Sequence, residues 1–244
     1  MAIFAGRNLT CIRGERLVFR GLDFALAEGE ALLLLGPNGS GKSSLLRLMA
    51  ALTAPAEGAL LWRDADLRAD RAAHSDRLHY LGHADAVKSA LTVIENLTFW
   101  ARLHGAGESE ARAAIARVGL TPLADAPARF LSAGQRRRLA IARLFSAAKP
   151  LWLLDEPSVG LDNASLDILE HGFAEHRAGG GIVVVATHTA LDLPAAESLI
   201  LGDFAPDPHA DPLDEDGLEW APDNPGNSPG DGTAVGSADA RPEA

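Results

Sequence analysis

The residues best suited to chemistry in this chain of 244 residues begin with a glycine-rich run that follows an apolar one. The run Gly36-Pro37-Asn38-Gly39-Ser40-Gly41-Lys42-Ser43-Ser44 matches the pattern G-x-x-x-x-G-K-[ST]. Its glycines let backbone N–H groups curl around phosphate oxygens. The lysine can neutralise the β- and γ-phosphates, and the Ser43 hydroxyl can bind Mg²⁺. The pattern predicts an ATP-binding P-loop. The alternative, a glycine-rich turn without a ligand, explains the pattern less well.

A second cluster pairs two acids at the end of the apolar run Leu151–Leu154. If this run is a buried strand beside the P-loop, Asp155 can hold Mg²⁺ through water and Glu156 can polarise the attacking water. The alternative is a strand that simply emerges into solvent. That interpretation is favoured for the dipeptide alone but not beside a P-loop, so the pair predicts hydrolysis.

A third motif, Leu131-Ser132-Ala133-Gly134-Gln135, precedes an arginine-rich helix and resembles the signature motif of ABC ATPases. Small residues and a serine at a helix N-terminus form a phosphate-binding surface. Ala133 replaces the more common glycine, a change of one methyl group. The resemblance implies that this surface contacts the ATP bound by a second copy, so that a homodimer encloses two nucleotides.

Weaker matches to the same family fill the remaining positions of its site. Ser158, Gly160, Leu161 and Asp162 resemble the D-loop, which signals between the two sites. His188, 32 residues after Glu156, resembles the switch histidine that contacts the γ-phosphate. His83 replaces the Q-loop glutamine, and the resemblance implies that it senses the γ-phosphate and Mg²⁺. Arg13 occupies the position of an adenine-stacking aromatic; a guanidinium plane can stack too, and a surface arginine is the alternative.

The elements that must position these residues alternate along the chain and predict a three-layer α/β domain with a mainly parallel sheet. The resemblance adds an N-terminal antiparallel β subdomain and a helical subdomain at about residues 84–135, within one ATPase domain over 1–202. The predicted strands are Ala31–Leu35, Leu151–Leu154 and Ile182–Ala186, with extended runs in Leu17–Leu26; the predicted helices are Lys42–Leu52, Leu91–Leu103, Glu108–Val118, Gln135–Ala148 and Leu166–Arg177.

Charge and composition set residues 203–244 apart. This segment has a charge of −10 out of the chain's −11, and it contains seven of the fourteen prolines. It has few large apolar residues to offset its ordering entropy, so we expect a disordered acidic tail; a docking motif around Leu218 and Trp220 is the alternative. Residues 1–202 are close to neutral, and we therefore expect no nucleic-acid partner.

Within the ABC ATPases, the chain is similar to the ATP-binding subunits of heme exporters used in cytochrome c maturation. The resemblance rests on Gly82-His83, the L-S-A-G-Q signature and the run from Gly14 to Phe19. It implies integral membrane permease partners, docking at Ala84–Ala90, and no direct contact with heme. We expect a peripheral position on the cytoplasmic face of the inner membrane, since no signal peptide or bilayer-spanning run is present. An ABC exporter ATPase for a drug, peptide or metal chelate, a soluble ABC ATPase and a non-hydrolysing regulator are the alternatives.

Overall fold

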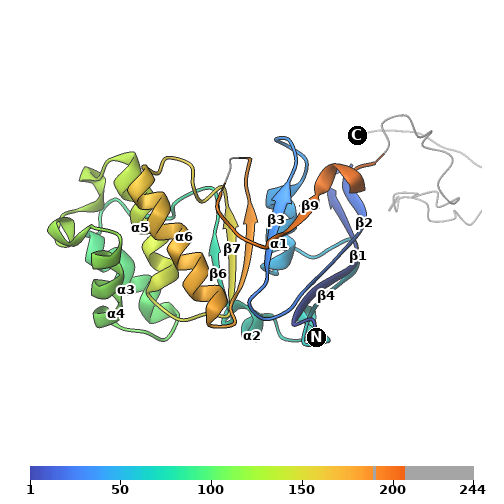
Figure 1. The fold of residues 1–244 in the computed structure, drawn as a ribbon, viewed down its shortest axis with the longest axis horizontal. Helices are drawn as coiled ribbons and strands as arrows, with labels where there is room; N and C mark the ends of the chain where they lie inside the picture. Colours follow the sequence, from blue (N-terminus) through green and yellow to red (C-terminus); the bar gives the residue numbers. More distant parts are fainter. Residues whose placement is uncertain (189–190, 207–244) are drawn as a thin grey trace, which may run out of the picture. The chain divides into compact units, whose positions relative to one another are not determined.

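Five parallel strands form the central sheet of this computed structural model, which describes residues 1–188 and 191–206 (Figure 1). The strand order is β6-β7-β8-β3-β9, and every neighbouring pair is parallel. β7 and β8 are buried at every residue, as strands covered on both faces should be. The strands are β3 (Ala31–Leu35), β6 (Leu78–Leu81), β7 (Leu151–Asp155), β8 (Ile182–Ala186) and β9 (Glu197–Ile200).

A second, antiparallel sheet packs beside the first, with the order β2-β1-β4-β5. β1 and β2 form a hairpin that closes at the pair Arg13 and Arg16, around a turn in which Gly14 has φ +59°. Glycine adopts this left-handed conformation without strain. The strands are β1 (Phe4–Arg13), β2 (Arg16–Leu26), β4 (Glu57–Trp62) and β5 (Ala65–Asp66).

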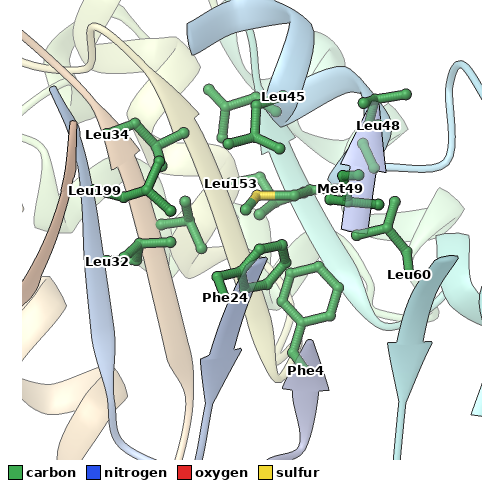
Figure 2. Close-up of a cluster of buried hydrophobic side chains, with 14 of the residues drawn as sticks. Phe4, Phe24, Leu32, Leu34, Leu45, Leu48, Met49, Leu60, Leu153 and Leu199 are labelled. Carbon is green, nitrogen blue, oxygen red and sulfur yellow. The ribbon is translucent and has the colours of Figure 1, made fainter. Parts of the chain in front are cut away.

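Helix α1 (Lys42–Met49) lies between the two sheets. Figure 2 shows its Leu45, Leu48 and Met49 in one cluster with side chains of both sheets. Among them, Phe4 and Phe24 come from the antiparallel sheet, and their rings meet edge to face at 5.2 Å. Because α1 begins at the end of the P-loop, this core fixes the loop against both sheets.

Three helices form a separate bundle: α3 (Val93–Leu103), α4 (Glu108–Arg117) and α5 (Ala133–Phe145). Thr92 and Glu95 form a reciprocal capping box at the start of α3. The bundle has its own apolar core, which includes Leu97 and Ile115. α5 also packs with α6 (Asn163–Ala178) on the central sheet, around Trp152 and Phe173. The remaining elements are α2 (Arg71–Ser75) and the 3-10 turns Leu67–Ala69, Thr121–Leu123, Ala128–Phe130 and Leu201–Phe204.

This architecture confirms the predicted fold class: a parallel core, an antiparallel subdomain and a helical subdomain. The boundary expected after Gly202 lies inside the turn Leu201–Phe204. Leu201 is fully buried and Phe204 packs against the core, so both ends of this turn belong to the folded domain. The predicted disordered tail lies, from residue 207 onward, outside the described residues. Of the described helices, none has the length and apolarity needed to cross a membrane.

The buried imidazole of His79 predicts a pH-dependent stability. Its Nε2 lies 2.8 Å from the Ala147 carbonyl oxygen, and burial lowers its pKa from 6.5 to about 3. The unfolded chain therefore binds the proton more readily than the folded one. The contribution of His79 to the free energy of unfolding is present above about pH 6.5 and is lost as the pH falls toward 3. We expect this residue to lower the free energy of unfolding by about 2 kcal/mol between pH 7 and pH 5.

Urea unfolding of the His79→Gln variant at both pH values measures this contribution, because the amide can still donate to Ala147 but does not titrate. The variant should lose that share of the pH dependence. An unchanged dependence would show that His79 is not the group responsible.

Candidate nucleotide-binding and hydrolysis site

The P-loop runs from β3 to α1 and is shaped by glycines that no other residue could replace without strain. Gly36, Gly39 and Gly41 have φ of +145°, +83° and +104°. A Cβ at Gly41 would lie 2.6 Å from a Val18 methyl, whereas one at Gly39 would meet nothing within 4 Å. The loop is thus packed on its inner side and open on its outer side. A glycine-rich backbone of this kind can direct N–H groups at an anion.

Lys42 is buried, with only 6% of its surface exposed, and its ammonium lies over the loop. Nζ donates hydrogen bonds to the carbonyl oxygens of Gly36 at 2.6 Å and Pro37 at 3.1 Å. The hydroxyl of Ser40 is buried without a hydrogen-bond partner in the described part of the chain. The loop thus combines a buried lysine with a hydroxyl that lacks a partner among the described residues, and both groups can bind a polyphosphate.

One cavity of about 760 Å³ collects most of the predicted site residues. This volume suits a nucleotide-sized ligand. Gly36 and Pro37 shape the loop from behind rather than line the cavity. The lining includes Arg13, Asn38, Gly39, Ser40, Gly41, Lys42, Ser43, Ser44, His83, Asp155, Glu156 and His188.

The acid pair sits where β7 ends, beside β8 and next to the P-loop. Asp155 is 4% exposed. Glu156 has φ +50°, a strained conformation for a residue with a side chain. Its N–H donates to the Ala186 carbonyl oxygen at 2.8 Å. This bond extends the strand pairing by one step.

Glu156 and His188 contact each other directly. Oε1 of the carboxylate lies 2.8 Å from Nδ1 of the imidazole, and the His188 N–H donates to Oε2 at 3.3 Å. The two residues were predicted from separate motifs, and the structure brings them together because β7 and β8 are adjacent. A histidine in this position can orient the carboxylate toward a water molecule.

The cavity also has lining residues that were not predicted. Arg16 faces Arg13 across the hairpin, and Leu17 and Val18 continue the same wall. The turn around Gly14 is a hairpin signal that could have indicated Arg16. Ala205 and Pro206 also line the cavity, and their composition resembles that of the tail, so no sequence signal pointed to them. Two guanidinium planes and apolar side chains can hold an adenine ring.

The signature residues lie apart from this cavity in the described chain. Ser132 caps α5: its Oγ accepts from the Gln135 N–H at 3.1 Å, and the Ser132 N–H donates to Oε1 of Gln135 at 2.8 Å. Ser132 and Ala133 are exposed. A Cβ built on Gly134 would lie 3.4 Å from the carbonyl oxygen of Gly160. The signature and the D-loop thus form one surface.

At the end of that surface, Asp162 caps α6, and hydrogen bonds from Ser165 lower the pKa of its carboxyl. The carboxylate is therefore held in its charged form at the N-terminus of α6, where it is favoured by the helix dipole.

Comparison with known proteins places this geometry in a family. The family model described as "ABC transporter" matches residues 19–159, more than half of the chain. The chain belongs to the ABC transporter family. ATP is therefore the nucleotide that the chain binds and hydrolyses.

Individual relatives agree with this membership. The chain is 58% identical, over 207 residues, to the "Cytochrome c biogenesis ATP-binding export protein CcmA" of Rhodospirillum rubrum, covering 85% of this chain and 89% of the relative. It is 54% identical over 206 residues to the protein of the same name from Paramagnetospirillum magneticum, covering 83% and 95%.

Solved ABC structures share the fold. A "Putative ABC transporter (ATP-binding protein)" from Pyrococcus furiosus aligns with a TM-score of 0.72 at 21% identity, covering 83% of this chain and 99% of that one. The "Dimeric structure of a post-hydrolysis state of the ATP-binding cassette MJ0796 bound to ADP and Pi" aligns with a TM-score of 0.69 at 23% identity, covering 77% and 88%.

The buried ammonium of Lys42 gives a prediction about ATP affinity. Lys42→Ala should weaken ATP binding roughly 10- to 100-fold, the range for a hydrogen bond to a charged group. Titration with a fluorescent ATP analogue would measure it. Lys149→Ala, which removes a lysine outside the cavity lining, is the matched control and should bind normally. Equal affinity in both variants would contradict the assignment of Lys42 to the phosphates.

Proposed function

We propose that the chain is the ATP-hydrolysing subunit of an ABC exporter that serves cytochrome c biogenesis, powering heme export or release of a heme-loaded chaperone. One observation carries the proposal: a cavity that unites the P-loop with Glu156 and His188, in a chain 58% identical to an ATP-binding export protein of that process. The cavity accounts for hydrolysis, and the relatives account for the process.

The proposed reaction uses the cavity as follows. Backbone N–H groups of the P-loop and the Lys42 ammonium hold the phosphates of ATP. Glu156 accepts a proton from the water that attacks the γ-phosphorus, and His188 steadies both the carboxylate and the γ-phosphate.

Hard oxygen ligands are available for Mg²⁺ at the exposed Ser43 hydroxyl and the Asp155 carboxylate, with His83 nearby as a sensor. The ion would neutralise charge that builds up on the phosphates. We propose Ser43 and Asp155 as its ligands because both line the same cavity and offer the oxygen donors that Mg²⁺ prefers.

The active unit is a homodimer in this proposal. The signature residues do not line the cavity of their own chain, so a nucleotide that contacts them must be bound by a second copy. The exposed Ser132 and Ala133 and the half-buried Gly134 form a helix N-terminus beside the D-loop, suited to a γ-phosphate presented by a second copy. A protein of the same fold has been solved as a dimer with ADP and Pi.

Membrane partners would dock on the helical subdomain. The loop of residues 84–90 leads from His83 to α3, and the exposed side chains of Phe99 and Leu103 lie on that helix. Exposed large apolar residues mark interaction surfaces when they gather in one place. We propose the heme-exporter membrane subunits as the partners and a peripheral position on the cytoplasmic face of the inner membrane.

The role of Glu156 gives a kinetic prediction. Glu156→Gln should lower kcat by roughly 10²- to 10⁴-fold, the usual contribution of a general base, while ATP binding persists. With Mg²⁺ and ATP the variant should elute as a dimer in size-exclusion chromatography with light scattering. Glu170→Gln, an acid that bonds the Asp192 N–H outside the cavity, is the control. Normal turnover by the Glu156 variant would show that another group activates the water.

The assignment to cytochrome c biogenesis predicts complementation. In a bacterium that lacks its own ATP-binding export protein of this process, the chain should restore covalent heme in c-type cytochromes, detected by heme staining of gels. Chains carrying Lys42→Ala or Glu156→Gln should not. If an active, membrane-associated chain restores none, the cargo assignment is wrong and the ATPase assignment stands.

A further inference from the structure

A buried arginine on α5 joins three parts of the site. Arg137 is 6% exposed, and its guanidinium has four acceptors. Nε donates to the Pro157 carbonyl oxygen at 3.2 Å, and one terminal nitrogen donates to the carbonyl oxygens of Glu156 and, at 3.4 Å, Asp155. The other terminal nitrogen donates to Oδ1 of Asp85 at 2.9 Å.

The first three bonds meet a need created by the end of β7. Past Asp155 the chain leaves the sheet, so the carbonyl groups of Glu156 and Pro157 have no strand partners among the described residues; the Glu156 carbonyl accepts one further bond, from the Val159 N–H at 3.3 Å. Glu156 is also held at φ +50°, a conformation that persists only when its surroundings impose it. The fork of the guanidinium offers several N–H donors in fixed directions, so one side chain can hold the whole turn.

The fourth bond leads to the loop of residues 84–90. The Asp85 side chain is 28% exposed, and its charge offsets that of the buried guanidinium. At its other end the loop is attached to α3, where the Asn96 amide donates to the Lys88 carbonyl oxygen at 3.0 Å and accepts from the Lys88 N–H at 2.8 Å. The loop is therefore tied to α3 on one side and, through Arg137, to the backbone of Glu156 on the other.

We infer that Arg137 is a positioning residue for hydrolysis, and that the Asp85–Arg137 ion pair couples loop 84–90 to Glu156. The inference rests on ATP hydrolysis in the cavity and is independent of the exported species. Arg137 holds the carbonyl groups around Glu156, and a shift of Asp85 pulls the same guanidinium.

Steady-state kinetics tests the positioning role. Arg137→Met should lower kcat by about 10- to 100-fold, the loss expected when a reacting group is displaced by about 1 Å, while KM for ATP changes less than about threefold. Arg137→Lys keeps the charge and one donor and should recover part of kcat. Arg177→Met is the matched control, because Arg177 also bonds two backbone carbonyls, those of Gly29 and Pro194, but away from the cavity. Its kcat should be unchanged.

The coupling is tested with Asp85→Asn, which keeps the side-chain shape and should fold even if Arg137→Met does not. It should lower kcat about 3- to 30-fold, the range for residues that transmit coupling, with Asp125→Asn as the control. A bimane label on Ser89→Cys reports on the loop, since the chain's one native cysteine, Cys11, is buried. Mg-ATP should shift its emission, and Asp85→Asn should abolish most of the shift.

Three results would overturn the inference. One is a normal kcat in a folded Arg137→Met or Asp85→Asn variant. Another is a loss expressed in KM alone. The third is a bimane response that is absent with Asp85 intact or equal in both proteins.

Discussion

The structure depends on the parallel pairing of β7, β8 and β3. Their registers place Asp155 opposite Ala186 and Ala186 opposite Leu34, so all three strands end at one edge of the sheet. The P-loop, the acid pair and His188 follow these strands directly and therefore meet without any long side chain reaching across the molecule. α1, packed between the two sheets, then fixes the phosphate-binding end (Figure 2).

The residues that follow a buried strand were predictable from sequence because the pattern is local. The apolar runs at β3, β7 and β8 and the motifs after them needed no long-range information. β1 and β4 were missed because their pairing is broken by register shifts and because neither strand alternates regularly between buried and exposed residues. α1 ends at Met49 rather than Leu52, since Ala51 adopts φ +54°. The Asp85–Arg137 pair joins residues 52 apart, which no local pattern records.

The cavity and the surface of the helical subdomain carry different kinds of information. The cavity has the oxygen, ammonium and backbone groups that ATP requires, and such groups are common to the family. These groups do not indicate what is exported, because the cavity does not contact the cargo in our proposal. The link to cytochrome c biogenesis comes from relatives that are 54–58% identical over most of this chain. Arg137 connects the two regions, with its guanidinium between Glu156 and loop 84–90.

In the proposed dimer, each ATP is held by the P-loop of one copy and the signature of the other. Mixed dimers test it directly: one copy keeps Lys42, and its tagged partner carries Lys42→Ala and Ser132→Cys, both in the Glu156→Gln background. An ATP analogue with a thiol-reactive γ-phosphate group should label the tagged partner, whose own P-loop is impaired. An absence of label at residue 132 of the tagged partner would contradict the account.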